Sequence, residues 1–154
     1  MRDGEDLTAD ESSGALLGGL DKHVGFMLRL AQVAVFKDLL SALKPFDLRV
    51  TDFSVLLVIG ATPGLKQQDV GRALRIQRPN LVTIIDQLQG RGLVHRGVVP
   101  GDRRSYALSL TEEGAAVLAK AKIAHKRHSK KVIAALGDID EGQMLAALER
   151  IAAI

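Results

Sequence analysis

The sequence contains no cysteine and no tryptophan, and only 3% of its 154 residues are aromatic. The lack of cysteine excludes disulfides, thiolate metal ligands, a cysteine nucleophile and cysteine-based redox sensing. A core with so few aromatic rings has to be built from Leu, Ile, Val and Ala, and richness in Ala and Leu favours helices. The missing cysteine also fits a reducing cytoplasm, where we expect the protein to be located.

Long apolar runs are missing as well. Glycine or a charged residue interrupts every candidate before it reaches the length of a membrane span, so we expect no membrane partner. Residues 1–11 are acidic, unlike a signal or transit peptide. The composition, with 47% hydrophobic and 25% charged residues, indicates a globular protein with the length of one ordinary domain.

The net charge of +3 is unevenly distributed along the chain. Residues 1–21 carry a net charge of −5 and residues 22–65 of +2, whereas residues 66–131 carry +9 and residues 132–154 carry −3. A basic segment between acidic ends suits a polyanionic partner such as a nucleic acid. Charge alone is equally compatible with a solvated basic face.

Residues 1–19 are rich in Gly, Ser and acidic side chains, which predicts a flexible acidic tail before a domain over residues 20–154. The first predicted helix covers Leu20 to Leu43 and ends at Lys44-Pro45, because the residue before proline is pushed out of helical geometry. This helix is apolar on more than one face, which suits a helix that packs on its own core and on a second subunit.

The middle of the chain predicts three short helices followed by a hairpin. Thr51 is a suitable N-cap for a helix to Gly60, residues 66–74 form a short helix, and Pro79 opens a helix to Gln89. Residues 93–110 change to the two-residue period of β-strands around a polar turn at residues 100–104. Further on, Thr111 caps a long helix to Leu136, and a last helix runs from Asp140 to Ile151.

This order predicts a mainly α fold with a small β-hairpin wing, in which residues 51–110 form a winged helix-turn-helix unit. A helix presented by a short turn fits the major groove of B-DNA, and the hairpin beside it can carry a cation to the backbone or the minor groove. Residues 66–110 have a net charge of +5, which suits phosphate neutralisation.

The sequence resembles the MarR family of transcriptional regulators, named for multiple antibiotic resistance. The resemblance is densest in residues 65–74, in residues 81–94 and in residues 101–114, where an Asp-x-Arg precedes an alternating strand and a Leu-Thr helix start. It implies a cytoplasmic homodimer with dimerisation helices in residues 20–44 and 111–154. It also implies a ligand-responsive repressor of a near-palindromic operator in double-stranded DNA, with no cofactor.

The resemblance makes the helix after Pro79 the recognition helix and residues 102–104 the tip of the wing. In the wing, Arg104 would reach the minor groove, Asp102 would orient it and Arg103 would contact phosphate. Arg, Asn, Gln and Thr are also suited to reading base edges. Pro79 and Asn80 stand where the family more often has Ser and Thr, and Lys66 replaces a capping Ser or Thr. The predicted DNA-binding residues are Lys66, Arg78, Pro79, Asn80, Thr83, Gln87, Asp102, Arg103 and Arg104.

The resemblance also implies a pocket near the dimer junction for a small aromatic or anionic effector, such as an aromatic acid or a coenzyme A thioester. Apolar walls with a few polar groups suit such a pocket, and the same side chains also suit core and dimer packing. The candidate ligand-binding residues are His23, Phe26, Met27, Arg29, Leu30, Phe46 and Phe53.

Other functions are less well supported by the residues. His125 and His128 lie three apart on a predicted helix, but Lys126, Arg127 and Lys130 around them would repel a metal cation. No nucleophile or acid–base pair stands out, so we expect no enzymatic activity. The basic residues of this helix suit a solvated face, DNA or an anionic ligand. The main alternative is a winged-helix protein-interaction module that does not bind DNA.

Overall fold

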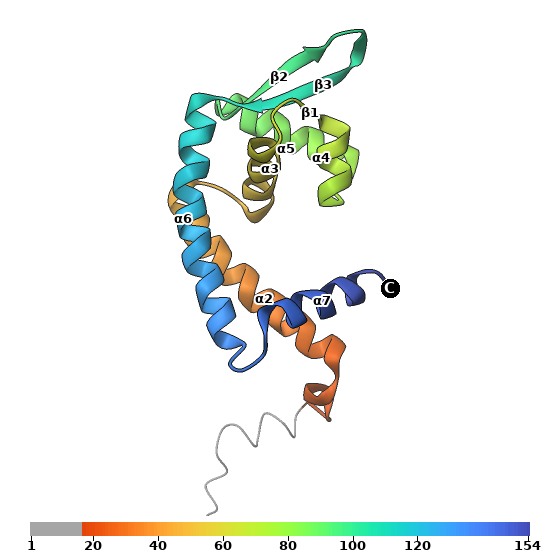
Figure 1. Cartoon of the computed structure of the whole chain (residues 1–154), viewed down its shortest axis with the longest axis vertical. Coiled ribbons are helices and arrows are strands. Elements are labelled where there is room, and N and C mark those ends of the chain that lie inside the picture. Colours follow the sequence, from red (N-terminus) through yellow and green to blue (C-terminus); the bar gives the residue numbers. More distant parts are fainter. Residues whose placement is uncertain (1–16) are drawn as a thin grey trace, which may run out of the picture. The chain divides into compact units, whose positions relative to one another are not determined.

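The computed structural model describes residues 17–154, except for the side chains of Arg103 and Arg104. Most of the predicted acidic tail, residues 1–16, therefore lies outside the described residues, and so do the side chains of two predicted wing contacts. The chain forms two compact units that divide between Lys37 and Asp38, inside one long helix. The order of helices and strands is drawn in Figure 1.

The first unit contains the 3-10 turn η1 (Leu20–Lys22) and most of helix α2 (Val24–Leu43). The predicted start of this helix at Leu20 is wrong, because His23 has an extended backbone with φ −96° and ψ 122° and separates the turn from the helix. The predicted end at Leu43 is confirmed. Large apolar side chains are exposed along this part of α2, at Val24, Met27, Leu30, Val33 and Phe36.

In the second unit, the 3-10 turn η2 (Lys44–Phe46) leads into helix α3 (Val50–Ala61). The predicted N-cap at Thr51 is wrong. The N-cap is Arg49, two residues earlier, and its backbone N–H donates to Oδ2 of Asp52 at 2.9 Å. This bond is one half of a capping box, in which the side chain of the third helical residue accepts from the backbone N–H of the N-cap.

Helices α4 (Gln67–Leu74) and α5 (Arg78–Gly90) follow, joined by a tight turn in which Arg75 has a left-handed φ of 53°. The spacing of the apolar residues in α5 is confirmed, since its four core positions are all buried. They pack into a core of aliphatic side chains from α2, α3, α4, the strands and α6, together with Phe53. The buried α5 positions are Leu81, Ile84, Ile85 and Leu88.

The sheet has three antiparallel strands in the order β1-β3-β2. Strands β2 (Val94–Val99) and β3 (Asp102–Leu110) form the predicted hairpin, but the turn is shorter than expected. Only Pro100 and Gly101 lie outside the strands, and Gly101 supplies the positive φ of 80° that the turn requires. The sequence did not reveal the two-residue strand β1 (Leu65–Lys66), which pairs with Leu108 and Ala107 of β3.

Helices α6 (Glu112–Ala135) and α7 (Glu141–Ala152) complete the second unit. Both predicted starts are confirmed. The Thr111 hydroxyl accepts from the backbone N–H of Gly114 at 2.9 Å, and the Asp140 carboxylate accepts from that of Gln143 at 2.9 Å. No helix within residues 17–154 is both long and apolar enough to span a bilayer.

Candidate nucleic-acid interface

A groove of about 1090 Å³ lies between α4, α5 and the hairpin of the second unit. Cationic side chains from all three elements border it, against two carboxylates, Asp86 and Asp102. Because cations outnumber carboxylates, the groove presents a net positive surface of the kind that binds phosphates. Its cationic residues are Lys66, Arg72, Arg75, Arg78 and Arg96.

Helix α5 turns its apolar side into the core and exposes its first turn. Arg78, Pro79, Asn80 and Thr83 are all exposed, as the predicted recognition helix requires. Arg78 borders the groove and has no ion-pair partner among the described side chains, whereas Arg72 is paired with Asp69 at 3.2 Å. An unpaired guanidinium is the group best suited to fork onto a guanine or a phosphate.

Two of the other predicted α5 contacts have partners within the protein. The hydroxyl of Thr83 donates to the carbonyl oxygen of Pro79 at 3.2 Å, so its proton is already engaged. The side-chain oxygen of Gln87 accepts a hydrogen bond from Arg49 of the α3 N-terminus. Gln87 therefore borders a second groove, of about 840 Å³, and not the one that contains Arg78.

Arg49 connects Gln87 to a buried carboxylate. Its guanidinium donates to both oxygens of Asp52, at 3.0 and 2.9 Å, and Asp52 is only 4% exposed. These hydrogen bonds and the opposite charge raise the pKa of Arg49, so its guanidinium stays ionised. The recognition helix is thereby linked to α3 through a side chain that the sequence analysis did not single out.

At the wing, Asp102 accepts a hydrogen bond from the Ser105 hydroxyl at 2.6 Å and lies 3.8 Å from the ammonium of Lys66. The predicted pairing of Asp102 with Arg104 lies outside the described side chains. Lys66 belongs to β1, which brings its ammonium to the start of β3. The two predicted residues Lys66 and Asp102 therefore meet at the wall of the groove.

Arg96 is a further residue of this surface, and the sequence alone indicates no more than its charge. Its side chain is 17% exposed and contacts both α4 and α5. The alternation of inward- and outward-facing residues along β2 could have indicated this role. Arg96 lies two residues after the buried Val94, so it points to the inner face of a strand, where a cation needs partners.

The predicted ligand residues divide between the two units. In the first, the Arg29 guanidinium lies 5.6 Å from the centre of the Phe26 ring, a cation–π distance. His23, Met27, Arg29 and Leu30 are exposed there, whereas Phe26 is half-buried. In the second unit, Phe46 packs against the core. The assignment of these residues to an effector remains a prediction.

Phe53 lies deep in the second unit and is 3% exposed. Its ring stacks on that of His125 in α6, with 5.0 Å between the ring centres. His125 in turn lies 6.1 Å from the ring of His128. His125 therefore forms part of the packing between α3 and α6.

His128 is buried and lies beside a charged pair. Its Nδ1 is 2.6 Å from Oδ2 of Asp38, and the ammonium of Lys131 is 2.9 Å from the other oxygen. These two hydrogen bonds, that of His128 first, hold the pKa of Asp38 below its usual value. Within the described part of the chain, no three His, Asp or Glu side chains are placed to hold a metal ion.

The half-buried imidazole of His125 predicts a loss of stability on mild acidification. Burial, and then the charge of His128, lower the pKa of His125 below its ordinary 6.5. The unfolded chain therefore takes up this proton at a higher pH than the folded chain, and stability falls as the pH drops below that value. We expect His125→Gln to flatten the change in denaturant midpoint between about pH 7.5 and 5.5.

His95→Gln serves as the control for this measurement, because His95 is exposed on β2. This variant is expected to keep the acid-dependent loss of the wild type. An equally steep pH dependence in His125→Gln would show that another group causes it. Asp38 adds a separate loss below about pH 3.8, where its carboxylate is protonated first in the unfolded chain.

Comparisons with known proteins agree with this geometry. A family model described as MarR family matches residues 46–105. A transcriptional regulatory protein for the hcr operon of Thauera aromatica is 32% identical over 136 residues, which cover 87% of this chain and 81% of that protein.

Solved structures extend the likeness to the whole described fold. The transcriptional repressor CouR bound to a 23-mer DNA duplex has a TM-score of 0.82 and 41% identity, over 88% of this chain and 96% of CouR. CouR bound to p-coumaroyl-CoA has a TM-score of 0.79 and 38% identity over the same shares. The winged helix-turn-helix unit, the cationic groove beside α5 and the similarity to these relatives lead to one conclusion. The chain belongs to the MarR family of transcriptional regulators.

Proposed function

We propose that the protein is a ligand-responsive repressor that reads DNA with α5 and the hairpin. The observation that carries the proposal is the groove between these elements, where the unpaired Arg78 stands at the start of α5 among four other cations. Arg78, Asn80 and Thr83 would face base edges or phosphates, and Lys66 and residues 102–104 would approach the backbone and the minor groove. Gln87 contributes through its bond to Arg49.

The operator would be read by two copies of the chain. MarR-family regulators are dimeric. Apolar side chains are exposed on the first part of α2, and on α7 at Leu145, Leu148 and Ile151. A second subunit would cover this apolar surface, which is in contact with water in a single chain. Two winged units on successive major grooves require half-sites about 34–36 Å apart, which corresponds to a near-palindromic operator.

The effector proposed here is an aromatic acyl thioester of coenzyme A. The support comes from the CouR relative, which has been solved with p-coumaroyl-CoA, and from the cations on α6. The phosphates of coenzyme A need such cations, and the aromatic acyl group needs an apolar wall. The exposed α6 cations are Lys120, Lys122, Lys126, Arg127, Lys130 and Lys131.

Release from DNA tests both parts of the proposal. The full chain is titrated onto a duplex from the region upstream of its own gene, and p-coumaroyl-CoA, coenzyme A and p-coumarate are then added separately. Release by the thioester alone supports the effector class. Tight binding that none of the three relieves would overturn the effector class and leave the DNA-binding function standing. Absence of duplex binding at low salt would favour the protein-interaction module instead.

Removal of the Arg78 side chain is expected to weaken operator binding. Arg78→Ala loses a guanidinium that no carboxylate of the described residues engages, so the cost falls on DNA binding and not on folding. A contact of this kind contributes about 1–3 kcal/mol, so we expect a loss of affinity of about 5- to 150-fold in a fluorescence anisotropy titration.

Arg127→Ala provides the matched control for this measurement. Arg127 is an exposed arginine on α6 and does not border the groove. Both variants lower the net charge equally, so a non-specific charge effect would weaken DNA binding equally in the two. An Arg78→Ala variant with the same affinity as Arg127→Ala would contradict the placement of α5 on DNA.

A further inference from the structure

Arg96 holds together three elements of the winged unit. From β2, its Nη1 donates to Oδ1 of Asp86 and, at 3.2 Å, to the side-chain oxygen of Gln89, both on α5. Its Nε donates to the side-chain oxygen of Gln67 on α4 at 3.2 Å. The guanidinium also lies 5.7 Å from the centre of the Tyr106 ring on β3.

This geometry leaves Arg96 little capacity for DNA. Two of its three nitrogens are engaged by side-chain oxygens of α4 and α5, one face is near an aromatic ring, and the side chain is 17% exposed. Arg78, in contrast, has no ion-pair partner among the described residues and is exposed. The two arginines border the same groove but have different roles.

Asp86 is the unusual member of the set. Its side chain is 55% exposed and borders the groove, where a lone carboxylate would repel the phosphates of an approaching duplex. The ion pair with Arg96 neutralises this charge. The same ion pair connects the exposed side of α5 to the hairpin. Asp86 therefore has a structural role that offsets the repulsion between its negative charge and the DNA phosphates.

We propose that Arg96 is a positioning residue that fixes the angle of the wing against the recognition helix through Asp86, Gln89, Gln67 and Tyr106. It acts on DNA through the elements it joins and does not contact the duplex itself. This inference rests on the proposed DNA binding. Judged by charge alone, Arg96 would favour DNA binding and Asp86 would oppose it, whereas the inference gives both residues the same positioning role.

Two carboxylate variants distinguish positioning from a simple charge effect. Asp86→Ala removes a negative charge from the groove, so electrostatics alone would tighten DNA binding. If Arg96 positions the wing through Asp86, the same variant weakens operator binding, by about tenfold for a coupled contact of this type. Asp69→Ala is the control, because Asp69 pairs with Arg72 inside α4, and among the described residues no hydrogen bond or ion pair joins it to the hairpin or α5. This variant should not weaken binding.

A double-mutant cycle completes the affinity measurement. We expect Arg96→Gln to weaken operator binding, and Asp86→Ala combined with Arg96→Gln to be no weaker than the worse single variant, because both remove the same link. Asp86→Asn keeps an oxygen acceptor for Arg96 and is expected to recover part of the loss. Asp86→Ala that binds as tightly as the wild type or more tightly, while Arg96→Gln binds weakly, would make Arg96 a direct phosphate contact and overturn the proposal.

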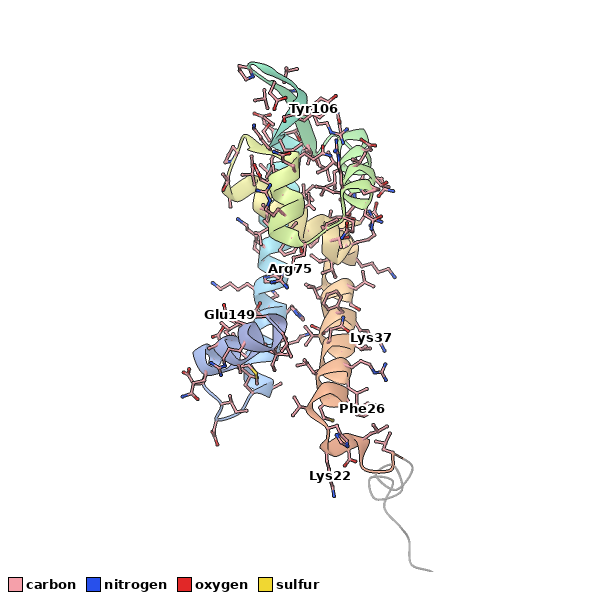
Figure 2. All side chains as sticks on the ribbon, turned by 90° about the vertical axis from the view of Figure 1, so that its right-hand side faces the viewer. Lys22, Phe26, Lys37, Arg75, Tyr106 and Glu149 are labelled. Carbon is pink, nitrogen blue, oxygen red and sulfur yellow. The ribbon has the colours of Figure 1, made fainter. Side chains whose placement is uncertain are left out.

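Tyr106 provides a readout that does not involve DNA. It is the only tyrosine of a chain that has no tryptophan, so its fluorescence reports on the junction of hairpin and α5. Figure 2 shows Tyr106 among the side chains of the hairpin. We expect Arg96→Gln and Asp86→Ala to raise the quenching of this emission by acrylamide, and Asp69→Ala to leave it unchanged.

The two readouts separate this inference from the function on which it rests. If the wild type binds no duplex but Tyr106 still responds to Arg96→Gln and Asp86→Ala, the positioning role stands and the DNA-binding proposal fails. If the duplex is bound and Tyr106 does not respond, the positioning role is wrong. A denaturant titration of each variant confirms that it is folded before either result is used.

Discussion

Replacement of Gly114 by alanine is expected to destabilise the protein strongly. A Cβ at this buried position would lie 1.9 Å from the carbonyl oxygen of Leu93 and 2.8 Å from its carbonyl carbon. These are backbone atoms, and the same carbonyl accepts a hydrogen bond from the Thr111 N–H at 3.1 Å. The start of α6 would have to separate from the strand that leads into the hairpin.

The expected cost of this overpacking is about 3 kcal/mol or more, which corresponds to a fall of roughly 6–12 °C in Tm for a chain of this size. Thermal unfolding at fixed protein concentration measures it. Gly90→Ala is the matched control, because a Cβ at Gly90 in α5 would meet no atom within 4 Å. This control should be neutral or slightly stabilising. A Gly114→Ala variant that melts with the wild type would show that the approach of Leu93 is looser than described.

Operator affinity is expected to fall steeply with ionic strength. Besides Arg96, which is bonded within the winged unit, four cations border the groove, so two units neutralise several phosphates and release the counterions bound to them. For about 6–10 phosphate contacts, the association constant falls by about 10³ to 10⁵ between 50 and 200 mM salt. A titration series at four or five salt concentrations gives the slope directly.

A duplex of unrelated sequence is the control for this series. It should show a comparable slope with weaker binding throughout, because phosphate contacts carry the salt dependence and base contacts carry the specificity. Arg78→Ala should make the slope shallower if its guanidinium meets a phosphate, and should reduce only the preference for the operator if it meets a base. A slope near zero for the wild type would remove the electrostatic basis of the proposed function.

Much of the fold was predictable because its signals are local. Helix α5 follows from the spacing of its four buried residues and from Pro79 near its start, and α6 follows from Thr111 and the acidic first turn. The hairpin follows from the change of period after Leu93. The mainly α architecture with a small wing is confirmed by the structure and by the MarR-family relatives.

The unpredicted features depend on partners far away in the sequence. Strand β1 has only two residues and exists because β3 lies beside it. The bonds of Arg96 to Asp86 and of Gln87 to Arg49 span 10 and 38 residues, so the sequence alone did not indicate them. The cap of α3 is a local exception, because Arg49 is not a residue type that propensity scales rank as an N-cap.

The short strand β1 has a mechanical consequence. Its two residues pair with Leu108 and Ala107 of β3, and α4 begins at the very next residue. Movement of the hairpin therefore also moves the start of α4, and β1 adds to the link that Arg96 makes between the hairpin, α4 and α5. A small molecule that regulates DNA binding then has to move the winged unit as a whole. The quantity it changes is the distance between the two winged units of a dimer.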